Sequence, residues 1–165
     1  MRVSESRGVP AARPPVPGLE HIASVFATLG EPLEVGMTPS GRQRVIPITG
    51  GQVTGPRLTG EVLAGGADWQ TVLPDGTALI DTRYTVRLAD GALVSLATRG
   101  VRTGPAEVLQ ALLAGEDVDP AAYYFRLTVE ASTASAEHGW LNRGVFVGAA
   151  IRASSSVTYD AYLLT

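Results

Sequence analysis

The stretch that decides the fold is residues 77–102, which read TALIDTRYTVRL, then ADG, then ALVSLATRGVR. In residues 77–88 apolar and polar side chains alternate with the two-residue period of a strand, and residues 92–102 are again of β type. Between the two runs, Ala89-Asp90-Gly91 supplies the aspartate and glycine that tight turns favour. We therefore predict a pair of neighbouring antiparallel strands here.

The same pattern continues on both sides of this hairpin. Pro74-Asp75-Gly76 forms a second turn signal just before it, and short β-type runs separated by glycine, proline and aspartate recur at the spacing of a sandwich or barrel. The order of strand after strand argues against a parallel βαβ architecture. We predict an all-β, antiparallel, up-and-down barrel, with strands near 19–28, 43–49, 57–64, 68–73, 77–88, 92–102, 122–131, 140–152 and 156–164.

Two segments depart from the strand pattern. Residues 105–115 begin with a proline, place apolar residues at helical spacing and end in glycine, which predicts one short helix that plugs or covers a barrel end. Residues 1–17 are rich in proline and arginine and contain no apolar run of signal-peptide length. We expect a loose arm over 1–17 and a single barrel domain over 18–165.

The composition limits the classes of function. The chain has 165 residues, of which 45% are hydrophobic and 18% charged, and its formal net charge is −3. This charge provides no basic field for nucleic acid, and no run approaches the roughly 18 apolar residues of a membrane span. The chain has no cysteine, so it has no disulfide and no thiolate site. We expect a cytoplasmic protein with no nucleic-acid or membrane partner. Because a weakly charged surface tends to expose apolar patches, we also consider a homodimer possible.

The strand at 77–88 carries the first candidate site. Asp81 and Arg83 share one of its faces, whereas Ile80, Thr82 and Tyr84 share the other. The polar face either lies in water with an ordinary ion pair, or lines a barrel wide enough to fix the polar end of a ligand.

A second candidate follows a flexible Gly65-Gly66. Asp68, Trp69 and Gln70 place a carboxylate, an indole and an amide at the start of a strand, a common binding-site composition. The structural alternative is that Trp69 covers the core and Asp68 pairs with a backbone donor.

Further candidates lie near the C-terminus. Trp140, Asn142 and two glycines fall on one predicted strand, where the glycines either leave room beside the aromatic ring or let the strand bend. Tyr124 and Arg126 share a face of the strand at 122–131 and could donate to a ligand oxygen.

Other kinds of site find little support. His21 and His138 are isolated from other metal ligands, no Gly-x-Ser-x-Gly motif is present, and the glycine-rich residues 48–56 lack the lysine of a nucleotide loop. We read residues 48–56 as a bent connection between strands, and we predict no metal and no cofactor.

The ordered motifs also resemble those of the domain-of-unknown-function 3237 family, from about residue 19 to the C-terminus. The likeness implies a lipocalin-like antiparallel barrel and gives little about activity. Where the family pattern has an asparagine before an arginine-containing strand end, this chain reads Ala97-Thr98-Arg99. The motifs that carry the likeness are Gly50-Gly51, Gly55-Pro56, Gly60-Glu61-Val62-Leu63, Gly65-Gly66-Ala67-Asp68-Trp69-Gln70, Pro74-Asp75-Gly76-Thr77, Asp81-Thr82-Arg83-Tyr84, Asp90-Gly91-Ala92, Arg99-Gly100-Val101-Arg102 and Trp140-Leu141-Asn142-Arg143.

Two functions fit these residues, and we favour the first. The first function is that of a cofactor-free cyclase or isomerase, which folds a hydrophobic metabolite inside the barrel. The second is that of a carrier, which has the same cavity and no turnover. A third class, a structural domain, would have a barrel packed shut. In the enzyme, Asp81 or Asp68 would accept a proton and Arg83 would stabilise an oxyanion. The predicted substrate-binding residues are Trp69, Gln70, Tyr84, Arg102, Tyr124, Arg126, Trp140 and Asn142.

Overall fold

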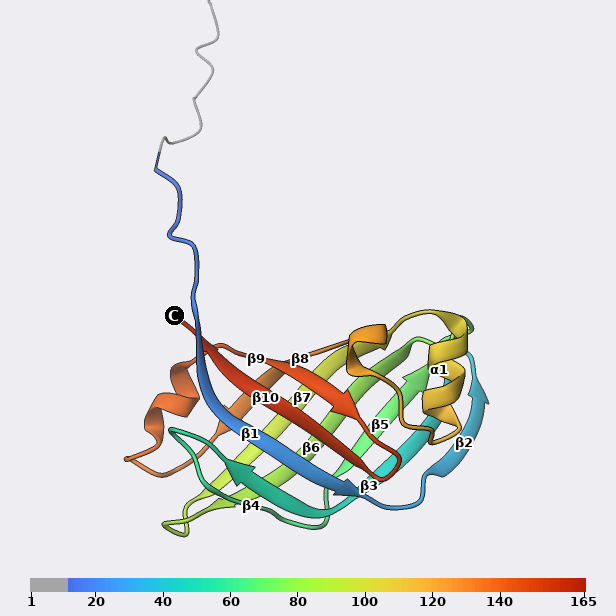
Figure 1. The fold of residues 1–165 in the computed structure, drawn as a ribbon. Helices are drawn as coiled ribbons and strands as arrows, with labels where there is room; N and C mark the ends of the chain where they lie inside the picture. The colour runs from blue at the N-terminus through green and yellow to red at the C-terminus, as the bar shows by residue number, and fades with distance from the viewer. Residues whose placement is uncertain (1–11) are drawn as a thin grey trace, which may run out of the picture.

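The structure, a computed structural model, describes residues 12–165 and shows a closed antiparallel barrel (Figure 1). Of the predicted arm, residues 1–11 lie outside the described residues, and residues 12–17 are exposed and precede the first strand. The strands are β1 (Leu19–Leu29), β2 (Leu33–Thr38), β3 (Gly41–Thr54), β4 (Gly60–Val62), β5 (Ala67–Val72), β6 (Ala78–Leu88), β7 (Leu93–Thr103), β8 (Tyr124–Ser132), β9 (Phe146–Arg152) and β10 (Ser156–Leu164).

Pairing between the first and third strands closes the barrel. The ring runs β1-β10-β9-β8-β7-β6 and returns to β3 through β5 at one end and β4 at the other, so it has eight positions, and β2 extends it outside. All pairings are antiparallel, which confirms the predicted fold class. The hairpin predicted from residues 77–102 is present as β6 and β7, which pair from Ala78–Arg102 to Arg87–Leu93.

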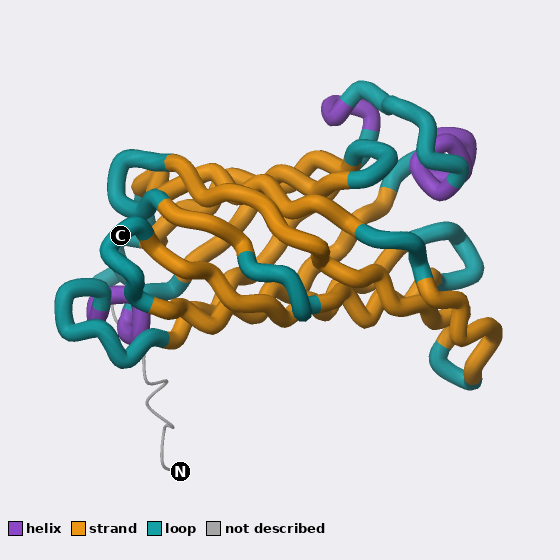
Figure 2. The backbone as a smooth tube through the Cα atoms, turned by 90° about the horizontal axis from the view of Figure 1, so that it is seen from below, coloured by secondary structure: helices purple, strands orange, loops and turns teal. Residues whose placement is uncertain are grey.

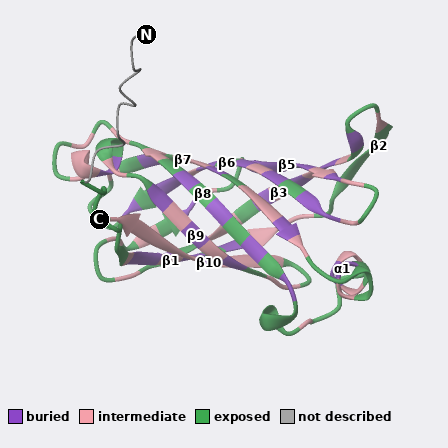
Figure 3. Ribbon diagram, turned by 90° about the horizontal axis from the view of Figure 1, so that it is seen from above, coloured by how far each residue is buried: buried purple, intermediate pink, exposed green. Residues whose placement is uncertain are grey.

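Alternation along each strand separates the core from the outer surface. On β6 the buried side chains run from Ala78 through Ile80, Thr82, Tyr84 and Val86 to Leu88, and the residues between them are exposed or half-buried. Figure 3 shows the same alternation as bands along β8. A sheet that closes on itself has its core inside the ring, so an inward position is a buried one.

Two glycines let β3 bend where it changes partners. On one side of β3 the partner changes from β5 to β4, and on the other side it changes from β2 to β1, which pairs from Ile48 onward. Gly50 and Gly51 have φ of 154° and 146°, and a Cβ on Gly51 would lie 1.9 Å from the carbonyl oxygen of Phe26. The segment predicted as a bent connection is therefore a bent part of one continuous strand.

Three strand predictions need correction. The strand predicted at 57–64 is only the three-residue β4, because residues 57–59 and 63–64 belong to the irregular connections on either side of it. Strand β2 was not predicted, because Leu33–Thr38 is short and contains a glycine. The strand predicted at 140–152 begins at Phe146, since Gly139–Arg143 form a turn of 3₁₀ helix.

The predicted helix is α1 (Ala106–Leu113), which packs Leu109 and Leu112 into the core and ends before Gly115. Figures 1 and 2 place it outside one end of the barrel. A second 3₁₀ turn, Pro120–Ala122, leads from it into β8. Across residues 12–165, the helices are all too short or too polar to cross a membrane.

Candidate active site

A cavity opens inside the barrel at the end where α1 lies. It contains about 530 Å³ of space free of atoms, counting its mouth, and the centre of a water molecule can move through about 50 Å³ of that space. This is room for several waters, since one water needs roughly 10–15 Å³ on the same measure. The walls are mainly apolar, and polar groups converge from β5, β6, β7, β9 and β10. The lining residues are Ala27, Leu29, Ile46, Ile48, Asp68, Gln70, Ile80, Thr82, Thr98, Arg102, Phe125, Leu127, Arg152, Val157 and Tyr159.

A chain of hydrogen bonds fixes the carboxyl group of Asp68. The Gln70 amide nitrogen donates to Asp68 Oδ2 at 2.9 Å, and Arg44 Nε donates to Gln70 Oε1 at 2.9 Å. The β5–β6 ladder is interrupted at Trp69 and Gln70, and there the backbone amide of Asp81 donates to Asp68 Oδ1 at 3.1 Å. The side chain thus takes a backbone donor that would otherwise lack a partner.

Burial raises the pKa of Asp68 above its ordinary value of 3.8. The amide of Asp81, the side chains of Gln70 and Thr82, and the charge of Arg102 act in the opposite direction but do not cancel the effect of burial. A carboxyl group with a raised pKa holds a proton closer to neutral pH, which is the property a general acid or base needs.

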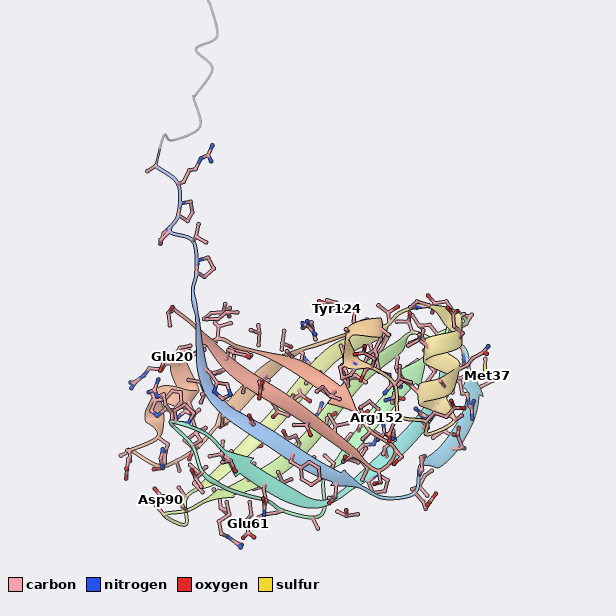
Figure 4. The ribbon with its side chains drawn as sticks, in the orientation of Figure 1. Glu20, Met37, Glu61, Asp90, Tyr124 and Arg152 are labelled. Carbon is pink, nitrogen blue, oxygen red and sulfur yellow. The ribbon has the colours of Figure 1, made fainter. Side chains whose placement is uncertain are left out.

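Three arginines surround this single carboxyl group. Arg44 and Arg102 are buried, and Arg152 is half-buried at the mouth. Burial, then the charges of Arg152 and Arg44, lower the pKa of Arg102 to about 10, which leaves its guanidinium charged at neutral pH. Figure 4 places Arg152 at the α1 end of the barrel, far from Asp90 at the opposite end.

A pair of tyrosines crosses the interior below this site. The hydroxyl groups of Tyr84 on β6 and Tyr159 on β10 are hydrogen-bonded to each other. Tyr159 lines both the cavity of Asp68 and an apolar hollow on the other side, which Val25, Val86 and Phe146 also line. Burial raises the pKa of Tyr159 to about 12, so both hydroxyls stay protonated.

Four of the residues predicted from sequence are buried inside the barrel: Asp68, Gln70, Tyr84 and Arg102. The structure brings Asp68, Gln70 and Arg102 together around one cavity, and Tyr84 reaches Tyr159 beneath it. The alternative in which Asp68 pairs with a backbone donor is also correct, since the amide of Asp81 is that donor.

Of the two alternatives for this polar face, the one in which Asp81 and Arg83 point into the barrel is wrong, and the one with the face toward water is correct. The β6 alternation buries Ile80, Thr82 and Tyr84, so Asp81 is half-buried on the outer face and Arg83 is exposed. Asp81 faces Arg99 across the sheet surface, with Oδ1 3.8 Å from Nε. The strand itself is where the sequence predicts it. Its inward face was harder to identify, because the apolar Leu79 lies on the outer face together with Asp81 and Arg83.

Trp69, Tyr124 and Arg126 also lie outside the barrel. Trp69 alternates with the inward Asp68 and Gln70, and 49% of its surface is exposed. The Arg126 guanidinium lies 5.3 Å from the centre of the exposed Tyr124 ring, on the outer face of β8. None of the three lines the Asp68 cavity.

The last two predicted residues lie at the far end. Trp140, on the 3₁₀ turn, packs against Phe146 with ring centres 5.9 Å apart, and the guanidinium of Arg57 lies 3.8 Å above its ring. Asn142 is exposed and holds a loop through two hydrogen bonds to the backbone of Thr133, at 2.8 and 2.9 Å. Trp69 and Trp140, both predicted to bind substrate, therefore lie apart, and neither lines the Asp68 cavity.

Sequence reasoning missed Arg44 and Arg152. Arg44 precedes Ile46 and Ile48 on a two-residue period, and this pattern places an arginine on a buried face. Arg152 likewise follows Ala150 and Gly148 on β9. A search for arginines in phase with apolar residues would have found both.

His138 gains a partner that is distant in sequence. Its Nε2 lies 2.8 Å from Asp90 Oδ2, and potential ligand atoms of Asp90, Glu137 and His138 lie within 4.8 Å of one another. Both carboxylates are exposed, and the His138–Asp90 contact already accounts for the close approach.

Comparison with known proteins agrees with this fold. The family described as "Protein of unknown function (DUF3237)" matches residues 17–164. A UPF0311 protein of Bradyrhizobium diazoefficiens is 38% identical over 143 residues, which cover 87% of this chain and 93% of that protein. A β-barrel-like protein from Acinetobacter baumannii is 46% identical, with a TM-score of 0.83 over 93% of this chain and 99% of its own. A conserved protein of unknown function from Rhodopseudomonas palustris is 34% identical, with a TM-score of 0.89 over 92% of this chain and all (100%) of its own.

One relative has a named activity. The hydroalkoxylation enzyme phnH of Penicillium herquei is 32% identical over 81 residues, which cover 49% of this chain and 54% of that enzyme. The structure of an enzyme from the same fungus shares the fold, with a TM-score of 0.70 at 22% identity over 94% of this chain and 99% of its own.

Proposed function

The chain belongs to the DUF3237 family, and from this premise we propose that it is a cofactor-free cyclase or isomerase that acts on a hydrophobic secondary metabolite inside the barrel. The observation that carries the proposal is the buried carboxyl group of Asp68, with its raised pKa, in a mostly apolar cavity. Buried carboxyl groups of this kind act as general acids and bases near neutral pH.

The chemistry named for the fungal relative suits such a group. Hydroalkoxylation adds the O–H of an alcohol across a carbon–carbon double bond. Protonated Asp68 would give its proton to one alkene carbon, the substrate's hydroxyl oxygen would bond to the other, and the hydroxyl proton would return to Asp68. An isomerisation would use the same group to take a proton from one carbon and return it to another. Both reactions balance without an oxidant or reductant.

The donors in the cavity are unsuited to a metal ion. Asp68 is the single carboxylate among the lining residues, and the other charged lining side chains are arginines, which repel cations. We therefore propose a mechanism without a metal ion. A cytoplasmic location and a homodimer stay predictions from the sequence.

The size of the cavity limits how a substrate enters. Leu29, Arg152 and Val157 are the half-buried members of the lining and mark the mouth. With about 50 Å³ open to the centre of a water molecule, a bulky metabolite would place its reactive end inside and the rest at the mouth, or displace these side chains.

Exchange of carbon-bound hydrogen tests the proposal before a substrate is known. The protein is incubated in D₂O with a panel of aryl ketones and alkenyl phenols, and deuterium incorporation and ring closure are followed by mass spectrometry. At least one compound should react, and Asp68→Asn should slow that reaction by about 10²- to 10⁴-fold, the usual contribution of a general acid or base.

Glu130→Gln serves as the matched control, because Glu130 is an exposed carboxylate on the outer face of β8. The Glu130→Gln variant should catalyse the reaction at the rate of the unmodified protein. A protein that binds these compounds and changes none of them would support the carrier instead. Equal rates for Asp68→Asn and Glu130→Gln would overturn the role of Asp68.

A further inference from the structure

The charges that surround the cavity do not balance. Arg44, Arg102 and Arg152 act on one another and on Asp68, which gives three positive groups against one acid. Glu34 also attracts Arg44, but it is exposed and pairs with Arg42 at 3.0 Å. The site therefore carries an excess of about two positive charges when Asp68 is ionised and more when it is protonated.

The three arginines differ in what they bind. Arg44 donates to Gln70, and Arg152 Nη1 donates to the backbone carbonyl oxygens of Ala153 and Ser156. Arg102 lines the cavity with 2% of its surface exposed, and its Nε has no hydrogen-bond partner among residues 12–165. Its guanidinium lies 5.8 Å from the centre of the Phe125 ring, which supplies a weak contact at most.

A buried donor without a partner is rare, because leaving it unpaired costs free energy. The cost is greater for a charged group, and here two like charges add to it. An anion that pairs with Arg102 would recover this free energy, so the ligand-free protein holds a prepared position for negative charge.

We propose that the cavity binds the anionic group of an aromatic or other apolar organic molecule, a carboxylate or phenolate, with Arg102 as its direct partner. The inference rests on the same cavity as the proposed enzyme and adds the class of its substrate. Arg44 and Arg152 strengthen the positive potential, and the apolar body lies against Ile80, Phe125 and Leu127. Because Asp68 and Arg102 line the same cavity, a molecule anchored on Arg102 would share that cavity with the carboxyl group.

Benzoate and benzamide form the sharpest pair of probes, since they share a shape and differ in charge. Isothermal titration calorimetry at pH 7 and fixed ionic strength should show benzoate binding at least about tenfold more tightly, as expected for a charge-assisted hydrogen bond. Formate carries the charge without the ring and should bind more weakly than benzoate. Equal binding of benzoate and benzamide, or of benzoate and formate, would overturn the proposal.

Two variants on the same strand assign the effect to one arginine. Arg102→Met should remove the preference for benzoate over benzamide, whereas Arg99→Met should keep it, because Arg99 lies on the outer face of β7. A preference that survives Arg102→Met would contradict the direct role of Arg102.

A measurement on the unmodified protein covers the case in which Arg102→Met fails to fold. Nuclear Overhauser contacts between the benzoate ring and the methyl groups of Ile80 or Leu127 should appear. Contacts confined to the outer surface near Trp69 would overturn the proposal. If Asp68→Asn loses the exchange reaction but the protein shows no preference for anions, the proposed enzyme stands and its anionic substrate class is rejected. If the protein prefers anions but Asp68→Asn exchanges at the unmodified rate, the anion site stands and the catalytic role of Asp68 is rejected.

Discussion

Asp68 and Arg102 are both charged in water, and both lie where burial disfavours charge. Burial moves the pKa of Asp68 up and the pKa of Arg102 down to about 10. Their mutual attraction opposes both shifts and does not reverse either. Groups held in this way are typical of sites where free energy of folding is given up for binding or catalysis.

Arg102→Met should therefore stabilise the ligand-free protein. Methionine fills much of the same space with a flexible apolar chain and removes the unpaired charge. The free energy of unfolding should rise by about 1 kcal/mol or more, measured by urea denaturation at pH 7. A loss of about 2 kcal/mol would mean that Arg102 is a structural residue.

The raised pKa of Asp68 predicts a dependence of stability on pH. The unfolded chain loses this proton near pH 3.8 and the folded protein keeps it to higher pH, so the stabilising contribution is complete below 3.8 and is lost as the pH rises through the folded-state pKa. Asp68→Asn removes this dependence. The stability of the unmodified protein minus that of Asp68→Asn, measured by denaturation from pH 3.5 to 8, should fall as the pH rises. A difference that is flat or rises would contradict the raised pKa.

At the scale of elements, turns and alternation were sufficient to predict most strands. The β6–β7 hairpin, the neighbouring β5 and the lone helix α1 follow from local signals such as Pro74-Asp75-Gly76. The inward face of β6 stayed open in the sequence, because the polar Thr82 lies on the buried face and the apolar Leu79 lies on the outer one. Arg44 and Arg152 were missed because they come from strands far apart in sequence, Arg44 from β3 and Arg152 from β9.

The bend in β3 depends on a glycine. Gly51→Ala would bring a Cβ within 1.9 Å of the Phe26 carbonyl oxygen at a φ of 146°, so β1 and β3 would have to separate where the ring closes. The loss should be about 3 kcal/mol or more. Gly139→Ala is the control, because a Cβ there meets nothing within 4 Å, and it should change stability by less than about 0.5 kcal/mol. Equal effects in a thermal melt would contradict the role of the bend.

At the scale of the whole molecule, the barrel interior contains two hollows, and the hydrogen-bonded pair Tyr84 and Tyr159 lies between them. The hollow beside α1 contains Asp68 and Arg102 among its apolar walls, and the other hollow is lined by apolar side chains and Tyr159. The contact between Tyr84 and Tyr159 joins β6 to β10 across the interior. It forms the floor of the site and ties opposite walls of the barrel together.

Removing both hydroxyls of this pair should cost less than the sum of removing each one alone. Tyr159→Phe leaves the buried Tyr84 hydroxyl without its partner and should lower the free energy of unfolding by about 1–3 kcal/mol. The double variant Tyr84→Phe with Tyr159→Phe should lose clearly less than the sum of the two single variants, in a double-mutant cycle measured by denaturation. Strict additivity would show that the two hydroxyls do not interact.

The positively charged interior is the central claim, and a crystal structure of the protein grown with benzoate tests it most directly. The carboxylate should lie inside the barrel at the α1 end, within hydrogen-bond distance of the Arg102 guanidinium, with the ring against Phe125 and Leu127. Benzoate bound only on the outer surface beside Trp69, with the cavity closed around water, would contradict the claim.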